Sequence, residues 1–359
     1  NLLNWREDGK QKILEPNTVI RGNYRLVSKV GEGGMGEVWK AIDLIQDAGD
    51  ARDRYVAIKF LSQEIQGKEF ALKALVREFA RYRQLIHPNL VRAYELNRDE
   101  NLLFIVMEFL PGTPLDQFIK KNPNGVSLKQ ARSIIKGMCD ALAYSHQEGV
   151  IHLDFKPSNV LYDPNTNTTK VIDFGIARLS EQQDRDLTRF DPGILGASTK
   201  AYSTPEMMID SDPMPCDDVY GLSCVIYKLL TGTHPFRELN SISAENKALK
   251  PEPVKSLSKS QFRALVRGLA FRRKDRTENA SKLYQELFPN FVQANWHLSR
   301  KSLIAVLVLI IVLVAPVLYK AAFQMPIFMV FERGSNTAII LALPTLLRRP
   351  FKVVSMEVG

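Results

Sequence analysis

The sequence predicts an α+β protein built in two lobes, a small sheet-rich lobe followed by a larger helical one. Within residues 1–110, short runs of β-branched and aromatic residues alternate with turn residues, as is typical of antiparallel strands. From Ser127 onward, apolar residues recur at helical spacing. The dipeptide Pro111-Gly112 separates the two regions and predicts a hinge, with a ligand-binding crevice between the lobes.

The composition is that of a folded chain in a reducing compartment. With 359 residues, of which 45% are hydrophobic, the chain can bury a sizeable core. The net charge of +9 would suit nucleic acid or an anionic membrane surface. We expect no nucleic acid partner, because the sequence has no arginine-rich arm, zinc-ligand spacing or aromatic-interleaved basic run. Three scattered cysteines predict structural thiols: Cys139, Cys216 and Cys224.

Four segments predict the sheet-rich lobe. Residues 24–38, YRLVSKVGEGGMGEV, predict a strand, a glycine turn and the start of a second strand, and residues 55–60, YVAIKF, predict a third. Residues 70–85 combine strong helix formers with a periodic apolar stripe, which predicts one helix. Residues 102–108, LLFIVME, predict a further buried strand just before the hinge.

Helical patterning dominates the second lobe. Ser127 and Gln130 predict a capping box at the start of a helix. The apolar face of that helix comprises Leu128, Ala131, Ile134, Ile135, Met138 and Leu142. The same spacing returns at Phe262, Leu265, Val266 and Leu269.

The segment GEGGMGEV places Gly31, Gly33 and Gly36 on a turn between two strands. Backbone amides there can approach phosphate oxygens because no side chain intervenes. A flexible hairpin tip explains the glycines about as well, and the strand that follows excludes the dinucleotide-binding fingerprint, which needs a helix. Lys59 lies in the next apolar strand, where a cation needs a buried anion, and Glu78 on the following helix could supply it.

Residues 150–160, VIHLDFKPSNV, set Asp154, Lys156 and Asn159 close together. Asp173, in IDFG, follows a short apolar strand, where a carboxylate is either a turn residue or a ligand for a hard cation such as Mg²⁺. Each feature alone has a structural explanation. Together and in this order they supply what phosphoryl transfer requires, namely donors for the phosphates, oxygen ligands for metal ions and a carboxylate for the acceptor hydroxyl.

With these ordered motifs, residues 24–287 resemble the eukaryotic-like (Hanks-type) serine/threonine protein kinase family. The glycine loop is most similar to that of the bacterial membrane-anchored members. The resemblance implies the bilobal protein kinase fold, with a small β-rich N-lobe and a larger α-helical C-lobe. It also implies transfer of the γ-phosphate of ATP to Ser/Thr hydroxyls of proteins, including the kinase itself, with Mg²⁺ as the metal and Mn²⁺ as an alternative.

The resemblance further implies a role for each site residue. Asp154 would take the proton of the substrate hydroxyl, Lys156 would lie by the γ-phosphate, and Thr199 would bridge the two. Lys59 would bind the α- and β-phosphates, with Glu78 as its ion-pair partner. The implied metal ligands are Asn159 and Asp173. Met107 would be the gatekeeper, and the backbones of Glu108 and Leu110 would face adenine. The implied nucleotide site comprises Val30, Gly31, Gly33, Gly36, Val38, Ala57, Lys59, Met107, Glu108, Leu110 and Asn159.

Leu153 departs from the family pattern, because HRD motifs have arginine at this position to pair with a phosphate on the activation segment. Leucine cannot form that charge-assisted bond, so we expect non-RD behaviour, with basal activity that does not depend on the phosphate. Two structural contacts are also implied, an ion pair between Glu206 and Arg276 and an anchor for the catalytic loop at Asp218. Ser223 replaces a glycine of the family pattern, which we expect to affect helix packing alone.

A charge-free apolar run begins at Leu303 and ends at Tyr319, between basic residues. It predicts a single transmembrane helix at residues 303–323. ATP, Mg²⁺ and reduced thiols would place the catalytic part in the cytoplasm, so we expect a single-pass protein of the cell membrane. The apolar runs at 321–331 and 337–347 are too short to span a bilayer, and we predict no structure for them.

The predicted domain order is an N-terminal extension (1–23), kinase N-lobe (24–110), kinase C-lobe (111–290), basic juxtamembrane linker (291–302), transmembrane helix (303–323) and short tail (324–359). Membrane anchoring would raise the local concentration of the kinase and promote dimer contact and autophosphorylation.

Two other functions stay open. A membrane-anchored pseudokinase that acts as a scaffold usually lacks one of Lys59, Asp154 and Asp173, and this chain has all three. A small-molecule phosphotransferase shares the aspartate and asparagine chemistry. Lys156 and Thr199 argue against it, because they build a platform for protein substrates.

Overall fold

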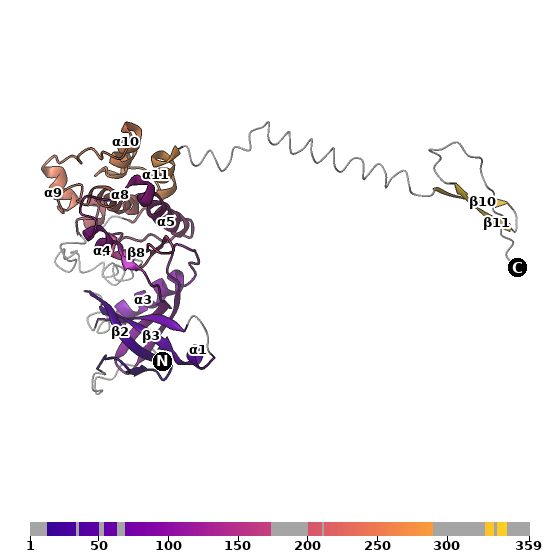
Figure 1. Ribbon diagram of the computed structural model, residues 1–359, viewed down its shortest axis with the longest axis horizontal. Helices are drawn as coiled ribbons and strands as arrows, with labels where there is room; N and C mark the ends of the chain where they lie inside the picture. Colours follow the sequence, from indigo (N-terminus) through magenta and orange to yellow (C-terminus); the bar gives the residue numbers. More distant parts are fainter. Residues whose placement is uncertain are drawn as a thin grey trace. The chain divides into compact units, whose positions relative to one another are not determined.

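The computed structural model describes residues 13–33, 36–49, 54–62, 69–173, 200–209, 212–289, 327–333 and 336–342. The chain divides into two compact units, Asn1–Pro289 and Asn290–Gly359, and each is described by itself. The first unit contains the two lobes that the sequence predicts, with the sheet at one end and most of the helices at the other (Figure 1).

An antiparallel sheet forms the N-lobe. Its six strands follow the order β1-β2-β3-β4-β6-β5. Their bounds are Val19–Ile20 for β1, Tyr24–Gly33 for β2, Gly36–Asp43 for β3, Tyr55–Leu61 for β4, Ala93–Asp99 for β5 and Leu102–Glu108 for β6. The strands predicted at 24–38, 55–60 and 102–108 are confirmed. The two edge strands, β1 and β5, were not predicted, and β5 has no apolar pattern because most of its residues are only half-buried.

Gly36 allows the glycine hairpin to lie closely against β4. Its φ is +127°, and a Cβ built on it would lie 1.8 Å from the carbonyl oxygen of Phe60. A side chain therefore cannot be accommodated without moving the backbone. The register that results places Gly36 opposite Leu61 and Val38 opposite Lys59.

The sheet buries both of its faces. Ala57 and Met107 belong to the large core that continues into the C-lobe, whereas Ile58 and Val106 belong to a smaller cluster within the N-lobe. This alternation follows from the period of two residues in a strand. Helix α3 (Glu69–Tyr82), predicted at 70–85, packs three buried side chains into the large core: Leu75, Phe79 and Tyr82.

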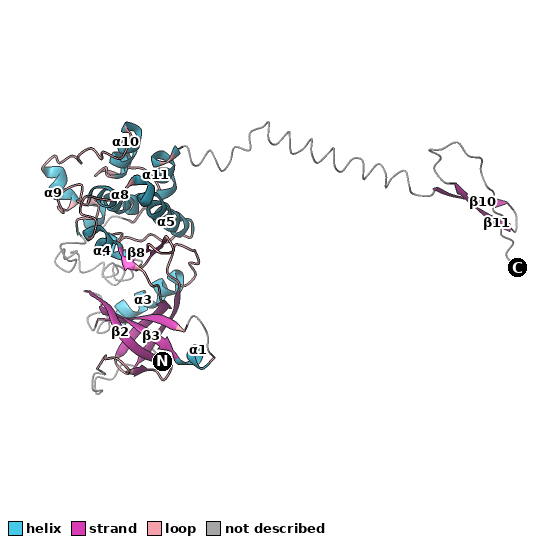
Figure 2. Cartoon of the chain, in the orientation of Figure 1, coloured by secondary structure: helices cyan, strands magenta, loops and turns pink. Residues whose placement is uncertain are grey.

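Helices make up most of the C-lobe, as the colouring of Figure 2 shows. Their bounds are Leu115–Lys120 for α4, Leu128–Gln147 for α5, Pro205–Met208 for α7, Pro215–Thr231 for α8, Ser241–Asn246 for α9, Lys259–Gly268 for α10 and Ala280–Leu287 for α11. A short helix α1, Leu44–Ala48, belongs to the N-lobe. Helix α8 is buried along most of its length and contacts α5, α10 and α11.

The predicted helix starts can be checked against the caps. Ser127 Oγ accepts the backbone N–H of Gln130 at 3.3 Å, so the serine half of the predicted box is present at α5. Helix α10 has the complete reciprocal box between Ser258 and Gln261, which the sequence analysis missed. The predicted apolar face of α5 is buried, with Leu128 partly covered and the others fully covered.

A small sheet next to the hinge supports the candidate catalytic residues. It has the order β7-β8-β9, with Thr113–Pro114 as β7, Val160–Asp163 as β8 and Thr168–Val171 as β9. The 3₁₀ helix Pro157–Asn159 leads into β8. Strand β9 is also tied to the segment before β5, because Val91 N–H donates to the Val171 carbonyl at 3.0 Å. The chain that leads to Asp173 is therefore fixed from two sides.

The described part of the second unit is an antiparallel hairpin of β10 (Ile327–Arg333) and β11 (Asn336–Ala342). We predicted no structure for this tail, although the strands overlap the two short apolar runs. The predicted transmembrane segment, residues 303–323, lies outside the described residues. In the ranges that are described, no helix combines the length and apolar character needed to cross a membrane.

Candidate active site

A buried carboxylate on α8 holds the loop that follows α5. Asp218 Oδ2 accepts the backbone N–H of His152 and Asp218 Oδ1 accepts that of Leu153, both at 2.8 Å. His146 Nε2 lies 2.7 Å from Asp218 Oδ2. Leu153 has a φ of +63°, which is unfavourable for leucine and needs support from its surroundings. The predicted anchor at Asp218 is therefore confirmed.

The trio Asp154, Lys156 and Asn159 converges on one carboxylate. Asp154 Oδ2 accepts from Lys156 Nζ at 2.7 Å and from Asn159 Nδ2 at 3.0 Å. Asn159 Nδ2 also donates to the Asp154 carbonyl at 2.8 Å. Asp154 Oδ1 is buried and has no hydrogen-bond partner within the described part of the chain. One oxygen is thus fixed by two donors, and the other can accept a further hydrogen bond.

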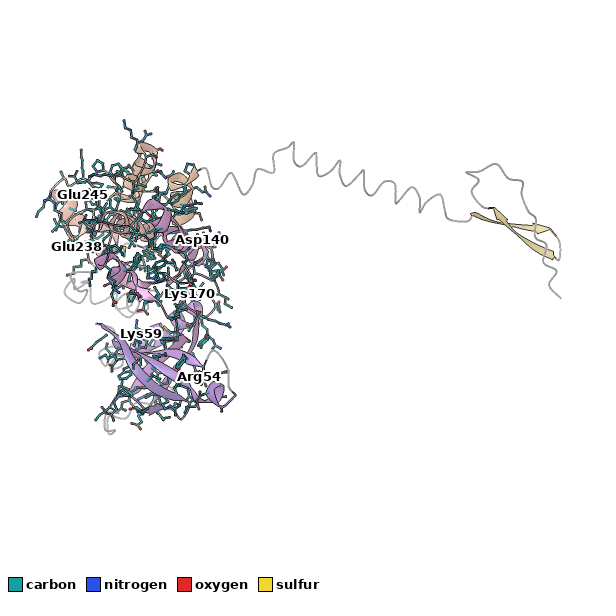
Figure 3. The ribbon with its side chains drawn as sticks, in the orientation of Figure 1. Arg54, Lys59, Asp140, Lys170, Glu238 and Glu245 are labelled. Atoms are coloured by element: carbon teal, nitrogen blue, oxygen red, sulfur yellow. The ribbon has the colours of Figure 1, made fainter. Side chains whose placement is uncertain are left out.

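An ion pair joins the sheet to the segment after β9. Lys59 Nζ lies 2.8 Å from Asp173 Oδ1. Lys59 is on the interior strand β4, and Figure 3 labels it on the side of the N-lobe that faces the C-lobe. Burial would raise the pKa of Asp173, but the positive charge of Lys59 and its hydrogen bond hold that pKa below the ordinary value. The carboxylate is therefore ionised at neutral pH. Asp173 also has a φ of +55°, so its backbone is held in an uncommon conformation.

Strand pairing brings the predicted nucleotide residues to one face of the sheet. Val38 is the partner of Lys59 across β3 and β4, and Ala57 is the partner of Met107 across β4 and β6. Direct partners point to the same face, and residues two apart on a strand share it. Val38, Ala57, Lys59 and Met107 consequently lie on a single surface, which leads along β6 to the hinge backbone at Glu108 and Leu110.

The glycine hairpin forms the other end of this surface. Gly31 pairs with Val38, and Gly33 pairs with Gly36. Val30 falls within an irregularity of the pairing and its side chain is 54% exposed. It therefore stays accessible to a ligand.

Thr199 and the side chain of Glu78 lie outside the described residues, so the ion pair between Lys59 and Glu78 stays a prediction. Among the described side chains, Asp173 forms an ion pair with Lys59.

The oxygen ligands present fit a hard cation. The Asn159 carbonyl accepts the backbone N–H of Ile172 at 2.9 Å, which brings Asn159 next to Asp173. Because Asn159 Nδ2 donates to Asp154, its amide oxygen is free to face another partner. A carboxylate and an amide oxygen are ligands that Mg²⁺ accepts when phosphate oxygens and water complete its octahedron.

Comparison with known proteins identifies the family. Residues 24–292 match the family model described as the protein kinase domain. The chain belongs to this family. The match extends through all of the strands and helices of both lobes, apart from β1.

The relatives of this kinase domain include bacterial serine/threonine kinases. The serine/threonine-protein kinase PrkC of Bacillus subtilis is 33% identical over 233 residues, which cover 65% of this chain and 34% of PrkC. The serine/threonine-protein kinase PknB of Mycobacterium tuberculosis is 31% identical over 278 residues, which cover 75% of this chain and 43% of PknB. The chain thus spans less than half the length of these relatives.

A solved structure shows the same fold. The kinase domain of Mycobacterium tuberculosis PknI superimposes with a TM-score of 0.60 at 21% identity, covering 77% of this chain and 98% of that one. The predicted bilobal protein kinase fold is therefore confirmed.

The predicted ion pair between Glu206 and Arg276 is confirmed within this kinase domain. Arg276 Nη2 lies 3.0 Å from Glu206 Oε2. The sequence analysis missed that Asp217 joins the pair, with its Oδ1 3.1 Å from Arg276 Nη1 and its Oδ2 2.7 Å from Arg273 Nη2. The Arg276 side chain is fully buried, so the two carboxylates compensate its charge in a site that water does not reach.

Ser223, which replaces a family glycine on α8, meets a glycine on α10. A Cβ built on Gly268 would lie 2.1 Å from Ser223 Oγ. The missing side chain at Gly268 makes room for the serine hydroxyl, so the helices can pack closely. Ser223 therefore lies at a close contact between α8 and α10, and the expectation that it affects helix packing alone stays a prediction.

Proposed function

We propose that this protein is a serine/threonine protein kinase that transfers the γ-phosphate of ATP to Ser or Thr hydroxyls of proteins, itself included. Family membership and relatives that are named serine/threonine kinases support the proposal. The observation that carries it is the environment of Asp154, whose Oδ2 is held by Lys156 and Asn159 while Oδ1 stays buried with no partner in the described ranges. A carboxylate prepared in this way can accept the proton of a bound hydroxyl.

In the proposed mechanism, Asp154 Oδ1 orients the acceptor hydroxyl and takes its proton as the hydroxyl oxygen attacks the γ-phosphorus. The bond from the γ-phosphorus to the β,γ-bridging oxygen breaks, and ADP leaves with that oxygen. Lys156 keeps Asp154 in place and sets a positive charge beside the phosphoryl group in transfer. Lys59 and Asp173 neutralise each other in the structure. When ATP binds, Lys59 turns to the α- and β-phosphates, and Glu78 takes over as its partner.

Asn159 and Asp173 would hold Mg²⁺, or Mn²⁺ in its place, which when bound supplies positive charge to the phosphate oxygens. Val38, Ala57 and Met107 provide an apolar surface for adenine, because all three share the face of Lys59. The Glu108 carbonyl and the Leu110 amide would hydrogen-bond the edge of the base. Serine and threonine are favoured over tyrosine because Lys156 follows Asp154 by two residues, as in Ser/Thr kinases.

Incubation with γ-labelled ATP and Mg²⁺ tests the function. A protein kinase labels itself or an added protein, and the label disappears in Asp154→Asn. A pseudokinase scaffold gives no label with wild type, and a small-molecule phosphotransferase labels only an added metabolite. Either of these two results would overturn the proposal.

We further propose that activity does not require phosphorylation of the activation segment. Leu153 is buried and uncharged, so this position offers a phosphate no ion-pair partner. Alanine at both Thr188 and Ser198, which lie outside the described residues, should leave kcat within about twofold of wild type. A fall of the doubly substituted enzyme to the level of Asp154→Asn would contradict this prediction.

We also propose that residues 303–323 anchor the kinase in the cell membrane, with the kinase domain in the cytoplasm. The charge-free run and the free, buried cysteines support this arrangement. Wild type should stay with the membrane fraction in alkaline carbonate, and a variant without residues 303–359 should be soluble. Extraction of wild type by carbonate would refute the membrane anchor.

Autophosphorylation of the truncated variant should depend more steeply on protein concentration, because anchoring no longer promotes dimer contact. Equal concentration dependence of autophosphorylation in wild type and the truncated variant would refute the dimer contact.

A further inference from the structure

Two successive hinge residues, Glu108 and Phe109, contact charged side chains that come from opposite lobes. Lys170 reaches Glu108 from β9 in the C-lobe, and Lys40 reaches Phe109 from β3 in the N-lobe. Neither lysine belongs to the motifs of the sequence analysis. Figure 3 labels Lys170 on the side of the C-lobe that faces the N-lobe.

The contact from the C-lobe is a two-point ion pair. Lys170 Nζ lies 2.7 Å from each of the two Glu108 carboxylate oxygens. The Lys170 side chain is 15% exposed and that of Glu108 is 27% exposed, so water screens the pair less than it screens most surface pairs. The Glu108 backbone N–H also donates to the carbonyl of Arg92, the residue just before β5, at 2.9 Å, and this bond fixes Glu108 from within the N-lobe.

This ion pair links the hinge to the metal-binding end of the site. Lys170 lies on β9, opposite Leu161 on β8, and the strand continues directly to Asp173. The end of β9 is itself held without Lys170, because Val171 N–H donates to the Asn89 carbonyl at 2.8 Å and Ile172 N–H donates to the Asn159 carbonyl at 2.9 Å. The ion pair therefore ties the hinge to a fixed strand, and its loss should act on the hinge and leave Asp173 in place.

The contact from the N-lobe is a lysine between two aromatic rings. Lys40 Nζ lies 3.8 Å from the centroid of Tyr55 and 4.8 Å from that of Phe109. The two rings are 6.3 Å apart and tilted by 54°. Lys40 pairs with Ala57 across β3 and β4, so it lies on the sheet face proposed to receive adenine. Cation–π attraction at this distance favours a fixed position of Phe109 relative to the sheet.

We propose that Lys170 and Lys40 are positioning residues that hold the hinge from the two lobes and thereby set its backbone for adenine. The inference rests on the proposed kinase function. Neither lysine needs to touch the phosphates, so both should act on ATP affinity through Glu108, Phe109 and Leu110. Loss of either contact should weaken recognition of the base and leave the transfer step at Asp154 intact.

The test compares Lys170→Met and Lys40→Met with wild type in the full-length chain. Each substitution should raise KM for ATP about three- to tenfold, with kcat unchanged within about twofold, as loss of a half-buried ion pair or a cation–π contact allows. Inhibition by Mg²⁺-tripolyphosphate, which lacks adenine, should keep its wild-type inhibition constant in both variants. Lys170→Arg should recover most of the affinity because arginine can bind the same carboxylate at two points.

Lys136→Met is the matched control. Lys136 also forms an ion pair, with Asp140, and lies 5.8 Å from the ring centroid of Tyr284, but both contacts are on the helices of the C-lobe. The KM of the Lys136→Met variant for ATP should equal that of wild type. The inference would be overturned by an unchanged KM for ATP in Lys170→Met and Lys40→Met. A loss of tripolyphosphate binding as large as the loss of ATP affinity, or a failure of Lys170→Arg to restore that affinity, would also overturn it. If the proposed function itself is wrong, wild type will show no ATP-dependent transfer at all, which separates the two failures.

Discussion

Asp154→Asn should lower kcat about 10²- to 10⁴-fold, the range that general-base catalysis typically contributes, while KM for ATP stays within about twofold of wild type. The expected split follows from the contacts. Asp154 is proposed to meet the acceptor hydroxyl, whereas the surface proposed for the nucleotide consists of Val38, Ala57, Met107 and the hinge. Steady-state phosphorylation of a generic protein acceptor at varied ATP measures both constants.

The substitution also tests the direction of the Asp154 hydrogen bonds. Lys156 and Asn159 both donate to Oδ2, so an asparagine must keep its oxygen at this position and turn its amide N–H towards the place of Oδ1. The group that faces the hydroxyl then donates a hydrogen bond and cannot take a proton. Asp140→Asn, on an exposed part of α5, removes one carboxylate charge elsewhere and should leave kcat unchanged. A kcat of Asp154→Asn near that of wild type would exclude Asp154 as the base.

Local patterns were sufficient to predict much of this fold. The β-branched and apolar runs in residues 55–60 and 102–108 and the apolar stripe of α5 depend on neighbours within one element, and the structure has these elements at nearly the predicted bounds. The candidate catalytic trio could also be predicted from the sequence, because Asp154, Lys156 and Asn159 belong to one short loop.

The features that escaped prediction depend on contacts between distant segments. The strand β5 has few buried residues, and it pairs with β6 along an edge that sequence periodicity does not reveal. The second partner of Arg276, Asp217, and the partners of Lys170 and Ser223 come from other elements, so no spacing along the chain could indicate them. The hairpin β10–β11 was missed because its apolar runs were considered only as candidates for a membrane span.

Asp218→Ala should destabilise the kinase domain by about 3–5 kcal/mol, as expected when one partner of a buried charged network is removed. The His152 and Leu153 N–H groups would both lose their acceptor in a site without water. Leu153 would also lose the bond that holds its φ of +63°. Urea denaturation of wild type and variant measures the difference, and Asp218→Asn, which keeps one carbonyl oxygen, should lie between them. A difference below about 1 kcal/mol would contradict the anchoring role.

The same anchor should make stability depend on pH. Burial would raise the pKa of Asp218, but the hydrogen bond and charge of His146 outweigh it and hold the pKa below the ordinary value. A carboxyl with a depressed pKa in the folded state contributes stability that is complete above the unfolded-state pKa of about 3.9 and is lost as the pH falls through the folded-state value. Wild type should therefore lose stability more steeply than Asp218→Ala below about pH 4. Because the carboxylate also fixes the backbone next to Asp154, kinase activity should fall over the same range before the domain unfolds.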